Sequence, residues 1–285
     1  MSEQCATFEL SLPGAGDPIR FAFTSGGDRD YVAYLVRAHG LASYEAPTPA
    51  VFAGLIREAP GLVLDIGANT GIFTFLAVAA SAAVSVCAFE PLEAARHLLH
   101  ANISCNPEMG CRVAVEPFAL SRMRAVVPFF ETINDQGLIS TSSSLEQNHA
   151  MQVGAHVQHE ITTETLDDWA EGAGQAPIQL IKIDVEGHEH AVIEGGRRTI
   201  RQHRPFIIVE VLGSADFSAL DRFLGEDDYR DFALSPGAMR GCASIRFHPD
   251  AWNHLLTPAE KVGLVSTVCQ RLGLPLENGS SDAAL

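Results

Sequence analysis

The chain has 285 residues, of which 47% are hydrophobic, and this is enough to bury a substantial core in one large domain. Its 35 acidic residues outnumber the 19 basic ones and give a formal net charge of -16. The overall positive field that binds phosphate backbones is therefore missing. We expect no nucleic-acid partner.

The cysteines and the uncharged segments indicate the compartment. None of the six cysteines forms a CxxC pair, and the first ten residues, MSEQCATFEL, carry acids where a secretory segment needs positive charge. We expect reduced thiols and a cytoplasmic location. The uncharged run between Asp65 and Glu90 is long enough to imitate a membrane span, but it contains glycines and polar residues and lacks flanking Lys or Arg clusters. It is better explained as a buried helix and a buried strand, so we expect no membrane span.

In chain order, residues 1–60 are mixed in composition and predict an irregular N-terminal flap with a short helix over 28–40. Apolar strands and helices then alternate as βαβαβ, and the pattern returns after residue 178. The expected elements are strands 62–67, 83–90, 111–120, 178–187 and 205–212 and helices 72–82, 92–104 and 189–202. Continuous apolar runs are typical of strands that helices cover on both faces. The order predicts an α/β fold with a largely parallel, doubly wound sheet.

Three further segments complete the expected organisation. Residues 229–248 can form two strands, DYRDFALS and ASIRFHP, which PGAMRGC joins at the sheet edge. The polar stretch 131–160 is too long for an ordinary connection and is interpreted as a substrate loop or lid. Residues 61–250 then form the main domain, and 251–285 form a C-terminal extension whose tail, ENGSSDAAL, is expected to be disordered.

A glycine-containing turn between a strand and a helix is the first candidate for ligand binding. In DIGANTG (65–71), Gly67 and Gly71 let the backbone turn tightly and approach a ligand. The interrupted spacing differs from the G-x-G-x-x-G of dinucleotide folds and disfavours NAD. Glu90 ends the next strand, where a carboxylate can accept both ribose hydroxyls of an adenosine.

Together with later motifs, these residues resemble the FkbM methyltransferase family from about residue 44 to 260. The motifs are LVLDIGANTG, VCAFEPL, FALS, TLDDW (165–169), LIKIDVEGHE (180–189) and RPFIIVEV (204–211). The resemblance implies a class I, Rossmann-like sheet of seven mostly parallel strands with an antiparallel last strand. It also implies S-adenosylmethionine as methyl donor and hydroxyl groups of sugars or natural products as acceptors.

The resemblance also assigns residues to the donor. Those implied are Asp65, Gly67, Asn69 and Gly71 for the methionine part, with help from Thr74, then Glu90 for the ribose, and the backbone around Phe118 and Ala119 for the adenine. One departure is Arg122, which stands where the family often has an acid after the ALS tripeptide.

The chemistry of methyl transfer points to the residues at the carboxyl end of the expected strand 178–187. Transfer needs an in-line arrangement of acceptor oxygen, carbon and sulfur, and a hydroxyl must lose its proton. Asp184 and Glu186 lie where ligands of open parallel sheets collect, and we expect Asp184 to position the reactants. The general base is expected to be Glu186 or His188. Alternatively, Asp184 only caps the helix that begins near His188, and His188 is an exposed residue of that helix.

Other polar residues near this edge are weaker candidates. The serine run within 140–145, Trp169 and Phe130 could contact a polyol, and Glu210 could line the acceptor pocket or be a buried core acid. Histidines occur nearby, but no stretch has convincing metal-ligand spacing, so no metal is predicted.

The preferred function is an O-methyltransferase that acts on a small hydroxylated acceptor or glycan. Three competing functions are an N-methyltransferase, a nicotinamide-dependent oxidoreductase, which the glycine spacing and the absence of a Tyr-x-x-x-Lys pair disfavour, and a non-catalytic partner subunit. The acceptor and the oligomeric state stay open.

Overall fold

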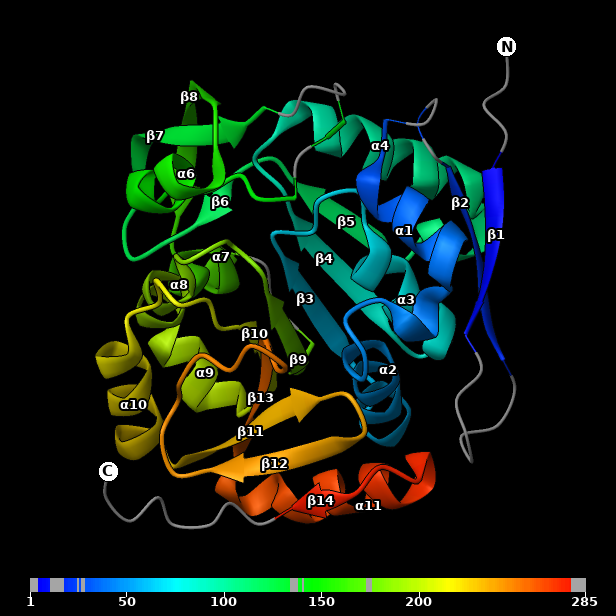
Figure 1. Ribbon diagram of the computed structural model, residues 1–285, viewed down its shortest axis with the longest axis vertical. Helices are drawn as coiled ribbons and strands as arrows, with labels where there is room; N and C mark the ends of the chain where they lie inside the picture. The colour runs from blue at the N-terminus through cyan, green and yellow to red at the C-terminus, as the bar shows by residue number, and fades with distance from the viewer. Residues whose placement is uncertain are drawn as a thin grey trace.

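The computed structural model describes residues 5–10, 18–24, 26, 29–133, 138–139, 141–172 and 176–277. A twisted nine-stranded sheet lies between two layers of helices (Figure 1). In spatial order the strands are β14 (Leu276–Glu277), β12 (Ala238–Cys242), β11 (Tyr229–Ser235), β13 (Asn253–Pro258), β10 (Phe206–Glu210), β9 (Ile178–Ile183), β3 (Leu62–Ile66), β4 (Ser85–Phe89) and β5 (Val113–Glu116).

The strand directions confirm the expected fold class. Strands β10, β9, β3, β4 and β5 pair in parallel, and β13 runs antiparallel between β10 and β11. These seven strands form the predicted sheet with one reversed strand. Strands β12 and β14 extend it at one edge. All five residues of β3 and of β10 are buried, as expected for strands covered on both faces.

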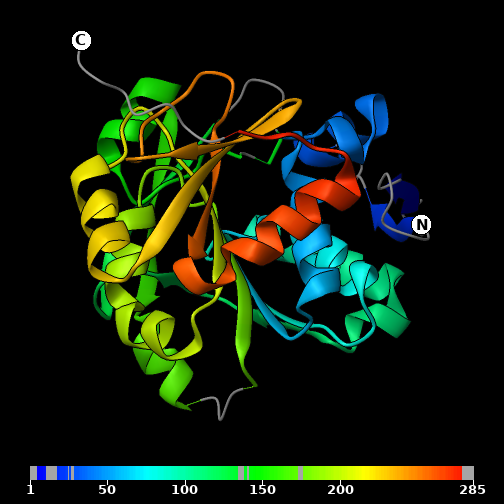
Figure 2. The same cartoon turned by 90° about the horizontal axis from the view of Figure 1, so that it is seen from below.

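Helices pack on both faces of the sheet (Figure 2). One face is covered by α2 (Thr48–Glu58), α3 (Ile72–Ala80), α4 (Glu93–Cys105) and α11 (Val262–Leu272), with the short α5 (Pro107–Gly110) after α4. The other is covered by α7 (Leu166–Gly172), α8 (Glu189–Gly195), α9 (Arg197–His203) and α10 (Phe217–Glu226). Side chains alternate along β3, since Val63 faces the first layer whereas Leu64 faces the second. The predicted helix 189–202 is two helices that meet at Gly196.

The first sixty residues are only partly a flap. Strands β1 (Cys5–Leu10) and β2 (Ile19–Thr24) form a two-stranded sheet, followed by α1 (Tyr31–His39) and the 3-10 turn η1 (Leu41–Ser43). The amide of Asn102 on α4 accepts from the backbone N–H of Thr24 at 2.7 Å and fixes β2 to the domain. Helix α2 is almost entirely buried beside α3 and α11. Its apolar residues pack in the main hydrophobic cluster, so this helix belongs to the core of the domain.

The segment 131–160 is more ordered than the predicted polar loop. It contains the end of β7 (Ala125–Thr132), all of α6 (Gln147–Val153) and the start of β8 (His156–Glu164). With β6 (Ala119–Leu120), β7 and β8 form a separate three-stranded sheet. The predicted strand 111–120 is therefore two strands in different sheets, because the chain bends at 117–118. Part of the stretch, 134–137 and 140, lies outside the described residues.

Predictions for the C-terminal part need correction. The strand paired with β11 is β12, which lies in the expected PGAMRGC connection, whereas ASIRFHP forms no strand. Strand β13 follows residue 250, so the sheet continues into the expected extension, through the 3-10 turn η2 (Ala259–Lys261) to α11. Most of the tail, 278–285, lies outside the described residues.

Two sequence predictions concern the compartment. Cys105 is disulfide-bonded, so the expectation of reduced thiols is wrong at this residue, whereas Cys87, Cys111, Cys242 and Cys269 are free. Among the described residues, no helix combines the length and the apolar character that a bilayer crossing requires.

Candidate active site

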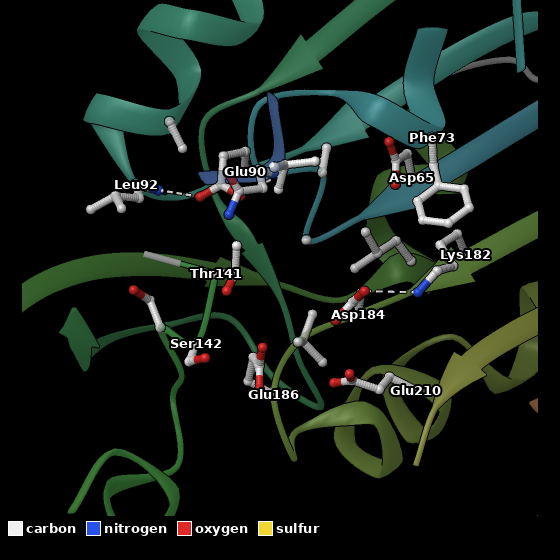
Figure 3. Close-up of a pocket in the computed structure, with 18 of the residues that line it drawn as sticks. Asp65, Phe73, Glu90, Leu92, Thr141, Ser142, Lys182, Asp184, Glu186 and Glu210 are labelled. Carbon is white, nitrogen blue, oxygen red and sulfur yellow. Dashed lines mark hydrogen bonds and ion pairs between the residues drawn. The ribbon is translucent and has the colours of Figure 1, made fainter. Parts of the chain in front are cut away.

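A cavity of about 460 Å³ opens at the carboxyl ends of the parallel strands (Figure 3). Its walls come from the loops after β3, β4, β9 and β10, from α1, and from the segment before α6. Ligands of open α/β sheets collect at this edge, because the strand ends leave a crevice between the loops.

The turn after β3 forms one wall. Gly67 has φ +81°, and a Cβ atom at this position would lie 1.8 Å from the carbonyl oxygen of Asp184. Only glycine fits this close approach between the β3 and β9 loops. Asn69 has a left-handed φ of 49° and lines the cavity, whereas Gly71 begins α3 outside the lining.

Asp65, on β3 just before this turn, is hydrogen-bonded to Thr74 on α3 after it. Its Oδ2 accepts a hydrogen bond from Thr74 Oγ1 at 2.5 Å, and burial raises the pKa of Asp65 to about 6 despite this bond. Asp65 lines the cavity, whereas Thr74 is completely buried behind it. Thr74 therefore orients Asp65 and does not face the cavity.

Glu90, at the end of β4, closes the same wall. Its Oε2 accepts from the backbone N–H of Asn69 at 2.8 Å, and its Oε1 accepts from the backbone N–H of Leu92 at 2.7 Å. Burial raises the pKa of Glu90 to about 7, while these two bonds act to lower it. A carboxylate has about four acceptor positions, so each oxygen keeps a lone pair for a ligand hydroxyl.

The neighbouring strand β9, on which Lys182 pairs with Asp65, contains a lysine that the sequence analysis missed. Lys182 on β9 is completely buried and donates to Asp184 Oδ2 at 2.8 Å. Although burial alone lowers a lysine pKa, the neighbouring carboxylates of Asp184, Glu45 and Glu210 together raise that of Lys182. Glu45 is held by Asn253, whose Nδ2 donates to its Oε2 at 3.0 Å. A lysine inside the apolar run IQLIKI was the signal for this ion-pair network.

Glu186 and His149 form a second pair, from the β9 loop and α6. His149 Nε2 lies 3.2 Å from Glu186 Oε2 as an ion pair without hydrogen-bond geometry. Glu186 raises the pKa of His149, whereas burial raises the pKa of Glu186. Glu186 adopts a left-handed φ of 57°, and Ser144 Oγ donates to its carbonyl at 2.7 Å. Such conformations persist where the surroundings hold them, often at functional sites.

His188 does not line the cavity, although the sequence made it a candidate base. Its Nδ1 donates to Glu146 Oε1 at 2.7 Å, because a carboxylate only accepts. Its Nε2 is hydrogen-bonded to Ser121 Oγ at 2.9 Å. Both ring nitrogens are thus engaged between β6 and the start of α6.

Some of the other predicted residues line the cavity and some do not. Asp184 and Glu210 face the cavity, and Thr141, Ser142 and Ser143 of the serine run line it (Figure 3). Ala119 also lines it, whereas Phe118, Phe130 and Trp169 lie outside the lining. Phe118 and Trp169 instead pack their rings on Phe89.

Together, the sheet order with its reversed strand, the glycine turn after β3 and the acid after β4 define a class I methyltransferase domain. The sequence model described as "Methyltransferase FkbM domain" matches residues 65–231, more than half of the chain. The chain therefore belongs to the FkbM methyltransferase family, and its cofactor is S-adenosylmethionine.

Among curated proteins, the chain is similar to the 2-O-methyltransferase NoeI of Sinorhizobium fredii (strain NBRC 101917 / NGR234), with 30% identity over 167 residues. The match covers 55% of this chain and 65% of that protein, just under two thirds of its length.

Solved structures give more distant similarities. The FkbM methyltransferase of Methylobacillus flagellatus KT has 16% identity and a TM-score of 0.46, covering 68% of this chain and 42% of that one. The O-methyltransferase of Bacillus cereus, solved in complex with SAH, has 14% identity and a TM-score of 0.42, covering 81% and 98%.

Proposed function

We propose that this protein transfers a methyl group from S-adenosylmethionine to a hydroxyl of a sugar, glycan or similar small natural product. The observation that carries the proposal is the two-sided cavity. One side has the glycine turn and Glu90, and the other has Glu186, His149 and the hydroxyls of Thr141 and Ser142 (Figure 3).

The first side suits the donor. A volume of about 460 Å³ is within the range of small-molecule sites. Glu90 is 6% exposed and keeps acceptor positions for ribose hydroxyls, while Leu92 and Ala119 offer apolar surface for a base. S-adenosylmethionine supplies an activated methyl group on a positively charged sulfur. The carboxylates of Asp65 and Asp184 favour that positive charge in the cavity.

The second side suits a hydroxylated acceptor. We propose that the hydroxyls of Thr141 and Ser142 bind acceptor oxygens, and that Glu186, paired with His149, accepts the proton of the reacting hydroxyl. As the O–H bond releases its proton to the carboxylate, the oxygen forms the new C–O bond. The C–S bond breaks and its electron pair goes to sulfur, which becomes a neutral thioether. The resemblance to a 2-O-methyltransferase supports oxygen as the acceptor atom.

A coupled assay tests this function. Purified protein is incubated with radiolabelled S-adenosylmethionine and a panel of mono- and oligosaccharides, with matched amines as the competing class. We expect labelled product from at least one hydroxylated acceptor and a loss of at least 100-fold in kcat with Glu186→Gln. Product from amines alone would favour N-methylation.

Binding measurements distinguish the methyltransferase from an oxidoreductase and from a non-catalytic subunit. We expect saturable calorimetric binding of S-adenosylhomocysteine, which the Glu90→Ala variant weakens about tenfold through loss of the hydrogen bonds from Glu90 to the ribose. Binding of NADH alone would instead support an oxidoreductase. Binding of the donor product without turnover on any acceptor would support a non-catalytic partner subunit.

A further inference from the structure

Three carboxylates converge on one point of the cavity wall. Asp184 and Glu186 follow β9, and Glu210 ends the neighbouring β10. One oxygen from each lies within 4.8 Å of the other two, and their side chains face a common space (Figure 3). Because β9 and β10 are parallel neighbours, their carboxyl ends bring residues 26 positions apart in sequence (210 - 184) to one site.

Two basic side chains contact this cluster, each at one of its carboxylates. Lys182 Nζ contacts Oδ2 of Asp184, and its positive charge also favours the ionised form of the partly buried Glu45. His149 contacts only the Oε2 side of Glu186. Among the described residues, the three carboxyl groups of the cluster and Glu45 thus share one lysine and one histidine, so acidic groups outnumber basic ones here.

Glu210 shows this excess at a single atom. The residue is 9% exposed, and its Oε2 is buried with no hydrogen-bond partner among the residues that the structure describes. An isolated buried carboxylate is costly, and buried charges normally bind a counter-ion or a metal. Glu210 lines the cavity, so a ligand that enters the cavity can reach it.

We propose that Asp184, Glu186 and Glu210 bind a hard divalent cation, Mg²⁺ or Mn²⁺. A ligand set made only of carboxylate oxygens suits these ions, whereas zinc sites usually include histidine or cysteine. Three protein ligands leave positions in an octahedral shell for water or acceptor hydroxyls. A cation at this site would lower the pKa of a hydroxyl that ligates it, beside the Glu186–His149 pair. This chemical role rests on the proposed function, whereas binding of the cation does not.

The test is metal binding by the protein alone. The full chain is treated with EDTA, exchanged into metal-free buffer and titrated with Mn²⁺, and free Mn²⁺ is followed by its electron paramagnetic resonance signal. We expect one saturable site from which Mg²⁺ displaces Mn²⁺. Glu210→Gln, which keeps the side-chain volume and removes the charge, should weaken binding at least tenfold. Glu90→Gln is the matched control, because it alters a buried carboxylate of the same cavity outside the cluster, and it should bind Mn²⁺ as the native protein does.

Circular dichroism spectra and cooperative thermal unfolding show that each variant is folded. No Mn²⁺ binding by a protein that binds S-adenosylhomocysteine would overturn the site, as would equal Mn²⁺ affinity of Glu210→Gln and the native protein. Mn²⁺ binding without methylated product from any acceptor would support the cation site while the proposed function fails. Methyl transfer that persists in EDTA, with no Mn²⁺ binding, would remove the cation site and leave the proposed function standing.

Discussion

The two sides of the cavity are built differently. The donor wall comprises Asp65, Gly67, Asn69 and Glu90 of the β3 and β4 ends, and the acceptor wall comprises Lys182, Glu186 and Glu210 of the β9 and β10 ends with Glu45 and His149. On the donor wall, Asp65 and Glu90 each accept hydrogen bonds from groups of the same wall, and the glycine turn fits closely against β9. On the acceptor wall, Lys182 is shared among several carboxylates and Glu210 has an unpartnered oxygen. The carboxylates of the donor wall are hydrogen-bonded within that wall, whereas the acceptor wall includes a buried carboxylate oxygen that a ligand can pair with.

The largest expected effect is on the acceptor wall. Lys182→Met keeps the length of the side chain but leaves Asp184 and Glu45 without their buried cation. Breaking one partner of a buried ion pair costs about 3–5 kcal/mol, and we expect this decrease in the free energy of unfolding, measured by urea denaturation. Lys261→Met is the control, because Lys261 is only partly buried, and it should cost about 1 kcal/mol or less. An equal decrease in the free energy of unfolding in both variants would contradict a stabilising buried ion pair between Lys182 and its carboxylates.

The next effect tests the close fit of the donor wall. Gly67→Ala places a Cβ atom against the Asp184 carbonyl and also strains a positive φ, so we expect a loss of about 2–4 kcal/mol together with weaker binding of S-adenosylhomocysteine. Gly237→Ala is a matched control with φ +90° and nothing within 4 Å of the added atom. It should lose only about 1 kcal/mol, the cost of the backbone strain. Similar losses in both variants would show that the contact with Asp184 is adaptable.

A third effect concerns pH and again the donor wall. The folded protein holds a proton on Glu90 up to about pH 7, whereas an unfolded glutamate releases it near its ordinary pKa of 4.5. Ionisation therefore favours the unfolded chain, and the contribution of Glu90 is full below pH 4.5 and is lost as the pH rises to 7. The shift corresponds to about 3 kcal/mol.

The Glu90→Gln variant isolates this contribution. Asp65, whose pKa rises to about 6, and Glu189, whose pKa rises to about 7, act in the same direction in the native protein and the variant. Glutamine cannot ionise, so the variant should lose less stability between pH 4.5 and 7 than the native protein, whatever constant cost it adds. Stability curves from thermal unfolding at several pH values measure the difference. Parallel curves would contradict a buried, protonated Glu90.

The same contrast explains how far the sequence alone could lead. The residues of the donor wall lie in short contiguous sequence motifs, since Asp65, Gly67 and Asn69 lie within five residues and Glu90 ends the next strand. The parallel part of the sheet was also predictable, because continuous apolar runs mark its central strands, whereas a reversed last strand was implied only by the family resemblance. Strand β13 was missed, since NHLLTP is short and follows a segment without clear periodicity.

The acceptor wall could not be predicted in this way. Its residues come from the segments around Glu45, His149, Lys182 and Glu210, and no local spacing relates them. Their proximity follows from strand order and from the position of α6, which are properties of the tertiary fold. A cluster of metal-ligand type was therefore invisible to a search for spaced ligands in one stretch. His188 shows the converse case, because it is close to Asp184 in sequence but does not line the cavity, and the chain turns between them with positive φ at Glu186 and Gly187.

The smallest expected effect separates the two candidate bases. His188 bridges Ser121 and Glu146 outside the cavity, so His188→Gln should loosen the start of α6 and lower kcat by less than tenfold. Glu186→Gln removes a carboxylate inside the cavity and should lower kcat at least 100-fold, as loss of a general base does. Steady-state rates of both variants on one acceptor, with binding of S-adenosylhomocysteine as the check on folding, make the comparison. A loss of 100-fold or more in His188→Gln with little change in Glu186→Gln would return the base to the histidine. That result would also mean that the loop carrying Ser144 and Glu146 moves when an acceptor binds, because His188 could then reach the cavity only by exchanging the Glu146 contact for the substrate.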